Sequence, residues 1–175
     1  MTMSLADRCA LIDMLVMDVD GVLTEGQIIY GDNGVELKAF HVRDGCGLAL
    51  WRGEGKRAGV ITGRTSATVA ARAKELGLDP VVQGASSKGA ALEEILAGQG
   101  LRADQVCYMG DDLPDVPALR RCGLAVAVAD ACPEAIAEAH YVTNRPGGRG
   151  AVRDTIELIL RCQGRWHHVV EHYRT

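Results

Sequence analysis

Residues 14–24 read MLVMDVDGVLT, and this stretch determines the fold that we expect. Its first four residues are apolar, and so short an apolar run is typical of a buried strand. Two carboxylates, Asp18 and Asp20, follow at once, and Gly21 then permits an unusual backbone turn. A lone pair of aspartates is more often an ordinary surface loop. Here a strand comes before the pair and a glycine comes after it. This context favours the interpretation that both carboxylates belong to a functional site at the end of the strand.

Outward from this stretch, short apolar strands alternate with segments of helical pattern. The predicted strands are Met14–Asp18, Arg57–Ile61, Pro80–Gln83, Gln105–Met109, Leu124–Val128 and Tyr141–Thr143. The predicted helices are Asp44–Glu54, Ser66–Leu76, Lys88–Ala97, Val116–Arg121, Pro133–Ala139 and Ala151–Gln163. Because the strands alternate with helices and several are apolar throughout, the sequence predicts an α/β fold: a mostly parallel sheet with helices on both faces.

A β-hairpin interrupts this alternation at residues 27–42. Two strand-like runs, Gln27–Tyr30 and Glu36–Val42, flank the turn sequence GDNG at 31–34. The length of 175 residues fits a single domain, which we expect to span 1–165 with the hairpin inserted. Residues 166–175 are expected as a C-terminal tail, either a surface helix or mobile, because their histidines lack the H-E-x-x-H order of a zinc protease.

Composition narrows the possible partners and the compartment. The net charge is −4 and the basic residues are scattered, so we expect neither nucleic acid nor a membrane as a partner. The six cysteines form no C-x-x-C pair, which argues against a zinc site or a disulfide framework. The N-terminal stretch lacks the basic start of a secretory signal. We therefore expect a cytoplasmic protein.

Three further polar elements follow predicted strands or begin a helix, where ligands of an open α/β sheet bind. The first is Thr62-Gly63-Arg64, whose hydroxyl and amides could bind a phosphoryl oxygen. The second is Lys88, at the start of a predicted helix. A positive charge there is unfavourable for the helix dipole, which indicates that Lys88 has a function. Each of these two elements alone also has a non-functional explanation. Thr62-Gly63-Arg64 could be an ordinary turn after a strand, and Lys88 could be a solvated surface lysine.

The third element is the acidic run GDDLPD at 110–115. Three carboxylates within five residues, directly after a strand, suit a hard divalent cation that prefers oxygen ligands. Taken alone, such a run is more often an acidic surface loop. The four elements together, in this order and at these places, are far more specific than any one of them.

Taken together, the elements resemble the four motifs of the haloacid dehalogenase superfamily, which has a Rossmann-like fold. The motifs are D-x-D-G-x-x-T, a strand-end threonine, a lysine at a helix start and G-D-D-x-x-D, and all are present without substitution. The resemblance implies that Asp18 is a nucleophile and that Asp20 protonates the leaving oxygen. It also implies that Thr62, the Gly63 amide and Lys88 hold the transferred phosphoryl group.

The same resemblance implies a Mg²⁺ cofactor. Its ligands would be Asp18, Asp111 and the main-chain carbonyl of Asp20. Two residues would support this centre, Asp115 by orienting Lys88 and Asp112 by supporting the metal shell.

Within the superfamily the chain resembles the phosphatases of 2-keto-3-deoxy sugar acids, most closely those of 3-deoxy-D-manno-octulosonate 8-phosphate, over about residues 10 to 162. The likeness rests on HVRDG at 41–45, TGR at 62–64, QG at 83–84, VAVAD at 126–130 and GGRGAVR at 147–153. It implies a role in lipopolysaccharide biosynthesis. The substrate-binding residues that it implies are His41, Val42, Arg43, Asp44, Gly45, Gly63, Arg64, Arg72 and Lys88.

The spacing of the motifs leaves no room for a separate cap domain. Only the hairpin and a helix fit between Asp20 and Thr62, and only a helix and a strand fit between Thr62 and Lys88. A site that is open to water discriminates poorly between substrates. Capless relatives form homotetramers whose hairpins close neighbouring sites, and the resemblance implies the same here. Arg64 and Arg72 are natural partners for a sugar-acid carboxylate, although Arg72 could equally lie on a solvated helix face.

Three alternatives remain open from the residues alone. One is a phosphatase of a nine-carbon sialic-type acid 9-phosphate. Another is a phospho-accepting signalling domain, against which Asp20 argues because it would drive hydrolysis of the phosphoaspartate. The last is a catalytically silent scaffold on the same fold, which should have lost motif residues that this chain retains.

Overall fold

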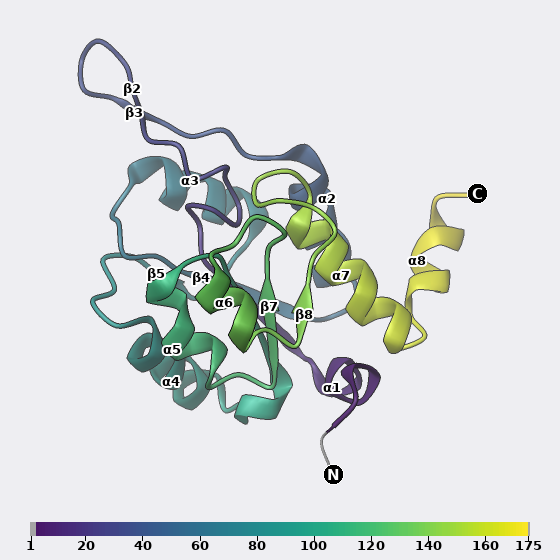
Figure 1. The fold of residues 1–175 in the computed structure, drawn as a ribbon. Helices are drawn as coiled ribbons and strands as arrows, with labels where there is room; N and C mark the ends of the chain where they lie inside the picture. The colour runs from purple at the N-terminus through teal and green to yellow at the C-terminus, as the bar shows by residue number, and fades with distance from the viewer. Residues whose placement is uncertain (1–2, 175) are drawn as a thin grey trace.

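The structure, a computed structural model, describes residues 3–174 and contains one six-stranded sheet with the order β5-β4-β1-β6-β7-β8 (Figure 1). Every neighbouring pair in this sheet is parallel, which confirms the predicted α/β fold. The strands are β1 (Met14–Met17), β4 (Arg57–Ile61), β5 (Val81–Val82), β6 (Val106–Gly110), β7 (Leu124–Ala127) and β8 (Tyr141–Val142).

Helices cover both faces of the sheet. One group, in which α1 and α2 pack against α7, lies on one face, and a second group of α4, α5 and α6 lies on the other (Figure 1). The helices are α1 (Leu5–Leu11), α2 (Val42–Gly53), α3 (Ala67–Leu76), α4 (Lys88–Gln99), α5 (Val116–Leu119), α6 (Pro133–Glu138), α7 (Ala151–Cys162) and α8 (Trp166–His172). Among residues 3–174, no helix has the length and apolar character needed to cross a membrane.

The centre of the core is β1, whose four residues are all completely buried. It pairs with β4 on one side and β6 on the other, so it meets side chains on both faces of the sheet. Trp51 and Tyr108 are the largest of the fully buried side chains around it. A strand enclosed in this way fixes the position of the residue that follows it.

The predicted hairpin is present but shorter than expected. It consists of β2 (Ile29–Tyr30) and β3 (Glu36–Leu37), which form a separate antiparallel sheet that projects from the body of the molecule (Figure 1). The predicted second strand continued to Val42, but in the structure Val42 begins α2. Several large apolar side chains of the hairpin are exposed: Ile28, Ile29, Tyr30, Val35 and Leu37.

Both ends of the described chain are helical. The N-terminal helix α1 was not predicted; it begins with a capping box in which Ser4 and Asp7 bind each other's main-chain amides. At the other end, α8 packs on α7, and the side chain of Trp166 is nearly buried there. The guanidinium groups of Arg153 and Arg161 lie 5.1 and 5.2 Å from the centre of the Trp166 ring, within the range of cation–π contacts.

Candidate active site

The register of the sheet brings the predicted strand-end residues together. Met17, the last residue of β1, is level with Val60 of β4 and with Met109 of β6. Asp18 therefore leaves the sheet beside the segments that carry Thr62 and Asp111. Its amide continues the ladder by donating to the carbonyl of Met109 at 3.0 Å.

Lys88 lies between two buried carboxylates. Its ammonium group is 2.8 Å from Asp18 Oδ1 and 2.7 Å from Asp115 Oδ1. Burial opposes the charge on Lys88, but the two carboxylates outweigh it, so the pKa of Lys88 is raised. The contact between Lys88 and Asp115 is the one that the family resemblance implies.

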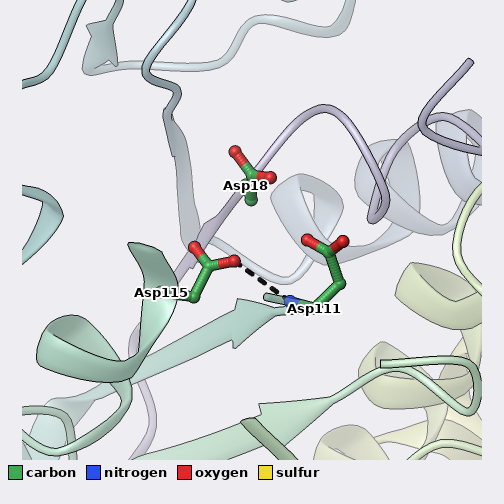
Figure 2. Close-up of side chains that lie close together, drawn as sticks. All are labelled: Asp18, Asp111 and Asp115. Carbon is green, nitrogen blue, oxygen red and sulfur yellow. Dashed lines mark hydrogen bonds between the residues drawn. The ribbon is translucent and has the colours of Figure 1, made fainter. Parts of the chain in front are cut away.

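Asp115 uses both of its oxygens within the protein. Oδ1 also accepts a hydrogen bond from the hydroxyl of Tyr108 at 2.6 Å, and Oδ2 accepts from the amides of Asp111 and Asp112 at 3.1 and 3.2 Å. Figure 2 shows Asp18, Asp111 and Asp115 close together. One carboxylate oxygen from each of them lies within 4.8 Å of the other two. Because the oxygens of Asp115 are occupied, Asp18 and Asp111 are the two that can bind a cation.

The electrostatics of this pair favour a cation. Burial, followed by the charge of Asp18, raises the pKa of Asp111 to about 8. Burial also raises the pKa of Asp18 to about 6, although Lys88 beside it acts in the opposite direction. Burial thus makes the negative charge of both carboxylates costly, and like charge from neighbouring aspartates adds to that cost.

The residues present fit the Mg²⁺ ion that the family implies. Asp111 Oδ1 is buried and has no hydrogen-bond partner among the described residues, and such an atom is costly unless something binds it. Two carboxylate oxygens at the end of a parallel sheet are the hard ligands that Mg²⁺ prefers. Asp112, which the resemblance assigns to the metal shell, caps the turn Leu113–Asp115 by accepting from the amide of Leu113 at 2.8 Å.

The Thr62 turn lies beside these carboxylates. Thr62 is buried, and its hydroxyl accepts a hydrogen bond from the amide of Arg64 at 3.2 Å. One cleft of about 280 Å³ is lined by the residues after the strands and by Lys88 at the start of α4: Asp18, Asp20, Thr62, Gly63, Arg64, Lys88 and Asp111. A larger hollow of about 380 Å³ lies between α2, α7 and α8, but most of its lining side chains are apolar and no residue of the four superfamily motifs lines it.

Asp20 is held from two directions. The hydroxyl of Thr24 lies 3.4 Å from Asp20 Oδ1, within the same turn. The ammonium group of Lys38, which follows β3 of the hairpin, forms a close ion pair with the same oxygen. Sequence reasoning missed Lys38, since no spacing rule relates it to a residue 18 positions earlier in the chain.

The remaining predicted substrate residues lie outside this cleft. His41, Val42 and Arg43 are at the start of α2, where Val42 is 79% exposed. Arg72 lies over the ring of Phe40 and forms an ion pair with Glu75 at 2.9 Å. It is packed against α2 so closely that a Cβ added to Gly45 would lie 2.4 Å from its guanidinium.

Asp44 is occupied elsewhere. It is 1% exposed, and its carboxylate accepts hydrogen bonds from the amides of Gly150 and Arg153 at 3.1 and 2.8 Å. Burial raises its pKa, although these amides act in the opposite direction. In this structure Asp44 joins the starts of α2 and α7 and faces no cleft residue.

A parallel sheet with carboxylates and a threonine after its strands, and a lysine at the start of a neighbouring helix, defines a haloacid dehalogenase-like hydrolase. A family model with that description matches residues 71–153. The chain is also 47% identical over 156 residues to the 3-deoxy-D-manno-octulosonate 8-phosphate phosphatase of Yersinia pestis, covering 89% of this chain and 83% of that protein. The phosphatase of the same name from Escherichia coli K12 is 46% identical over 154 residues, with 88% and 82% covered.

Solved structures agree with these relatives. The 3-deoxy-D-manno-octulosonate 8-phosphate phosphatase of Moraxella catarrhalis, solved with magnesium, phosphate and KDO, superposes with a TM-score of 0.94 at 40% identity, over 96% of this chain and 97% of that one. A cobalt-bound phosphatase from Haemophilus influenzae has a TM-score of 0.87 at 37% identity, with 90% and 92% covered. The chain therefore belongs to the haloacid dehalogenase-like hydrolases, and within them to the family of the 3-deoxy-D-manno-octulosonate 8-phosphate phosphatases.

Proposed function

We propose that this chain is a Mg²⁺-dependent phosphatase that hydrolyses 3-deoxy-D-manno-octulosonate 8-phosphate to the free sugar acid and phosphate. The observation that carries this proposal is the placement of Asp18 between Lys88 and the Asp111 carboxylate at the end of the central strand. The substrate comes from the relatives that carry this name at 46–47% identity over most of the chain.

In the proposed reaction Asp18 attacks phosphorus and forms an aspartyl-phosphate. Asp20, two residues further along the same turn, donates a proton to the leaving sugar oxygen and then takes one from the water that releases phosphate. The hydroxyl of Thr62, the Gly63 amide and the ammonium group of Lys88 hold the negative charge of the transferred group.

Asp18 and Asp111, with the main-chain carbonyl of Asp20, would hold Mg²⁺ in the proposed enzyme. When bound, the ion neutralises the repulsion between carboxylate and phosphate. The raised pKa values of Asp18 and Asp111 support this assignment, because burial makes their negative charges costly unless a cation lies beside them.

The test is phosphate release from a panel of phosphorylated sugar acids, with Mg²⁺ and with excess chelator. Asp18→Asn should abolish turnover and covalent labelling by substrate. Asp20→Asn should abolish turnover while leaving Mg²⁺ binding largely intact. Activity of Asp18→Asn within tenfold of the parent enzyme, or full activity in chelator, would contradict the mechanism. Preference for a nine-carbon acid phosphate would correct the substrate.

We further propose that the active enzyme is a homotetramer in which the hairpin of one subunit closes the site of another. The exposed apolar side chains of β2 and β3 support this, because a small hairpin seldom keeps so much apolar surface in water. The start of α2 with Arg72 supports it as well. These residues lie outside the cleft of their own chain and would be available to the sugar acid of a neighbouring subunit.

We place the reaction in the cytoplasm. The cysteines of the described chain are all free thiols, and three of them, Cys9, Cys107 and Cys122, are buried. Unpaired thiols are typical of a reducing compartment. Cell fractionation with an antibody against the protein tests this placement, and recovery outside the cytoplasm would contradict it.

A further inference from the structure

Asp20 receives its closest side-chain contact from the hairpin. The ammonium group of Lys38 pairs with Asp20 Oδ1, and the Lys38 side chain is only 1% exposed. The next contacts are longer: the Thr24 hydroxyl is 3.4 Å from the same oxygen, and Arg64 Nε is 3.8 Å from Oδ2. Oδ2 is buried and has no hydrogen-bond partner among residues 3–174. One oxygen of Asp20 is thus held by Lys38, and the other makes no hydrogen bond and lies beside Arg64.

The backbone of the Asp20 turn is fixed independently of Lys38. The amides of Leu23 and Thr24 both donate to the carbonyl of Val19, at 2.9 and 3.0 Å, and Asp20 forms a bridge with Thr24. These bonds position the Cα of Asp20 but leave its carboxylate able to rotate about the side-chain bonds. The ion pair with Lys38 restrains that rotation.

Lys38 reaches the turn because the strand-like segment after the hairpin tip presents alternate residues to the site. Glu36 and Lys38 point inward, whereas Leu37 between them is 52% exposed. Glu36 is fastened by Arg64 at 2.9 Å, and its main-chain carbonyl accepts from the hydroxyl of Thr68 at 3.3 Å. The arm that carries Lys38 is therefore docked on its own subunit.

We propose that Lys38 is a positioning residue for the proton transfer carried out by Asp20. It holds Oδ1 so that Oδ2 faces the leaving oxygen. As the bond between phosphorus and the leaving oxygen breaks and the bond to Asp18 forms, the proton passes from Asp20 Oδ2 to the leaving group. The ammonium group then faces the carboxylate that remains. In the second step a water molecule attacks phosphorus, gives its proton to Asp20 and displaces Asp18, so that phosphate is released. This inference rests on the proposed function of Asp18 and Asp20.

A merely structural role for Lys38 makes a different prediction. If its only effect were to fasten the hairpin, its loss would disturb the site for every substrate alike. A role through Asp20 depends on how much the leaving group needs a proton. Phenyl phosphate and p-nitrophenyl phosphate are similar in size, but the nitrophenolate ion leaves readily without protonation and the phenolate ion does not.

The experiment measures single-turnover release of phenol and nitrophenol by the Mg²⁺-loaded enzyme and by Lys38→Met. We expect Lys38→Met to slow release from phenyl phosphate by about 10- to 100-fold, less than the roughly 10²- to 10⁴-fold of general acid catalysis itself, because Lys38 acts only through Asp20. Release from p-nitrophenyl phosphate should change by less than about threefold. Asp20→Asn should show the same dependence on the leaving group, with a larger loss.

Thr68→Val is the matched control, since it removes a hydrogen bond that docks the same arm without touching Asp20. It should leave the ratio of the two rates unchanged. If Lys38→Met does not fold, Lys38→Gln carries the same test. Equal slowing of both esters, or no slowing, would overturn the role of Lys38 in an enzyme that is otherwise active. Failure of the proposed function would look different, because Asp18→Asn would then remain active.

Discussion

Gly21 and Asp111 approach so closely that a side chain at position 21 would take the place of the carboxylate. A Cβ added to Gly21 would lie 2.1 Å from Asp111 Oδ2. The backbone of Gly21 also has a φ of +103°, a conformation that other residues rarely adopt. The glycine of the DVDG sequence is therefore needed for two reasons, the turn and the space for a metal ligand.

Gly21→Ala should weaken Mg²⁺ binding by about 10- to 100-fold, the range seen when a supporting residue of a metal site is lost. Titration calorimetry with Mg²⁺ measures this. Gly34→Ala is the control, because Gly34 also has a positive φ, of +70°, but no atom lies within 4 Å of its added Cβ. It should leave Mg²⁺ affinity unchanged. Equal affinities in all three proteins would contradict this view of Gly21.

The metal-free protein should lose stability as the pH rises. Asp18 and Asp111 have pKa values of about 6 and about 8 in the folded chain, above their ordinary value of 3.8. Between the ordinary and the raised values, the folded chain binds more protons than the unfolded chain, so the free energy of unfolding falls with increasing pH. Mg²⁺ displaces those protons, so its stabilising effect should grow over the same range.

Thermal unfolding at about pH 5.5 and about pH 8, with chelator and with Mg²⁺, measures both effects over the range in which these two carboxylates titrate. With chelator, the unfolding midpoint should be lower at the higher pH. Asp111→Asn removes the carboxyl group with the larger pKa shift, so it should reduce the difference between the unfolding midpoints at the two pH values. A midpoint of the metal-free parent protein that rises with pH would show that these carboxylates do not govern the pH dependence.

Asp115→Asn should destabilise the fold strongly. The Asp115 carboxylate is fully buried and accepts from Lys88, Tyr108 and two amides, whereas an asparagine can accept only through one atom. Breaking a buried ion pair of this kind costs about 3–5 kcal/mol. Urea unfolding measures the loss. Asp104→Asn, at an exposed ion pair with Arg102, should cost less than about 1 kcal/mol, and similar losses for both variants would contradict the prediction.

Charged substitutions on the hairpin test the proposed tetramer. Ile29 and Leu37 face each other in the register of β2 and β3, and both are exposed in the single chain. Ile29→Lys and Leu37→Lys should therefore change the folding free energy by less than about 0.5 kcal/mol. They should break the assembly in light scattering and reduce turnover of the sugar-acid phosphate more than turnover of p-nitrophenyl phosphate.

Ile136→Lys is the matched control for assembly, because Ile136 is an exposed apolar residue on α6. It should leave the assembly intact. Phe40 is unsuitable for this test, since it packs against the core of its own chain with Arg72 over its ring. A fully active monomer, in the parent protein or in Ile29→Lys, would rule out sites completed across subunits.

The main sheet could be predicted from the sequence because its strands are short apolar runs that end at polar residues. The predicted strand at Arg57–Ile61 matches β4, and that at Met14–Asp18 exceeds β1 by one residue. Helix α1 carried a usable signal, the Ser4-x-x-Asp7 capping box, that the apolar pattern alone did not show. Signals of this kind depend only on residues that are close in the sequence. They therefore allow the positions of individual helices and strands to be predicted.

Contacts between distant segments could not be predicted in the same way. The family resemblance implies that Asp44 binds substrate, yet its carboxylate accepts from the amides of Gly150 and Arg153, more than 100 residues away. Nothing in the sequence singled out Lys38, because its pairing with Asp20 depends on how the arm docks. Sequence patterns show which residue types are present at each element, whereas packing decides which of them meet.

The division of the chain into two separate sheets has a consequence for hydrogen exchange. The amides of β1, β4 and β6 lie in the buried centre of the large sheet, so they should exchange with solvent only when most of the domain opens. The amides of β2 and β3 pair only with each other in a two-stranded sheet with exposed side chains. Asp18 thus follows a strand whose amides should exchange slowly, whereas Lys38 follows a hairpin whose amides should exchange sooner.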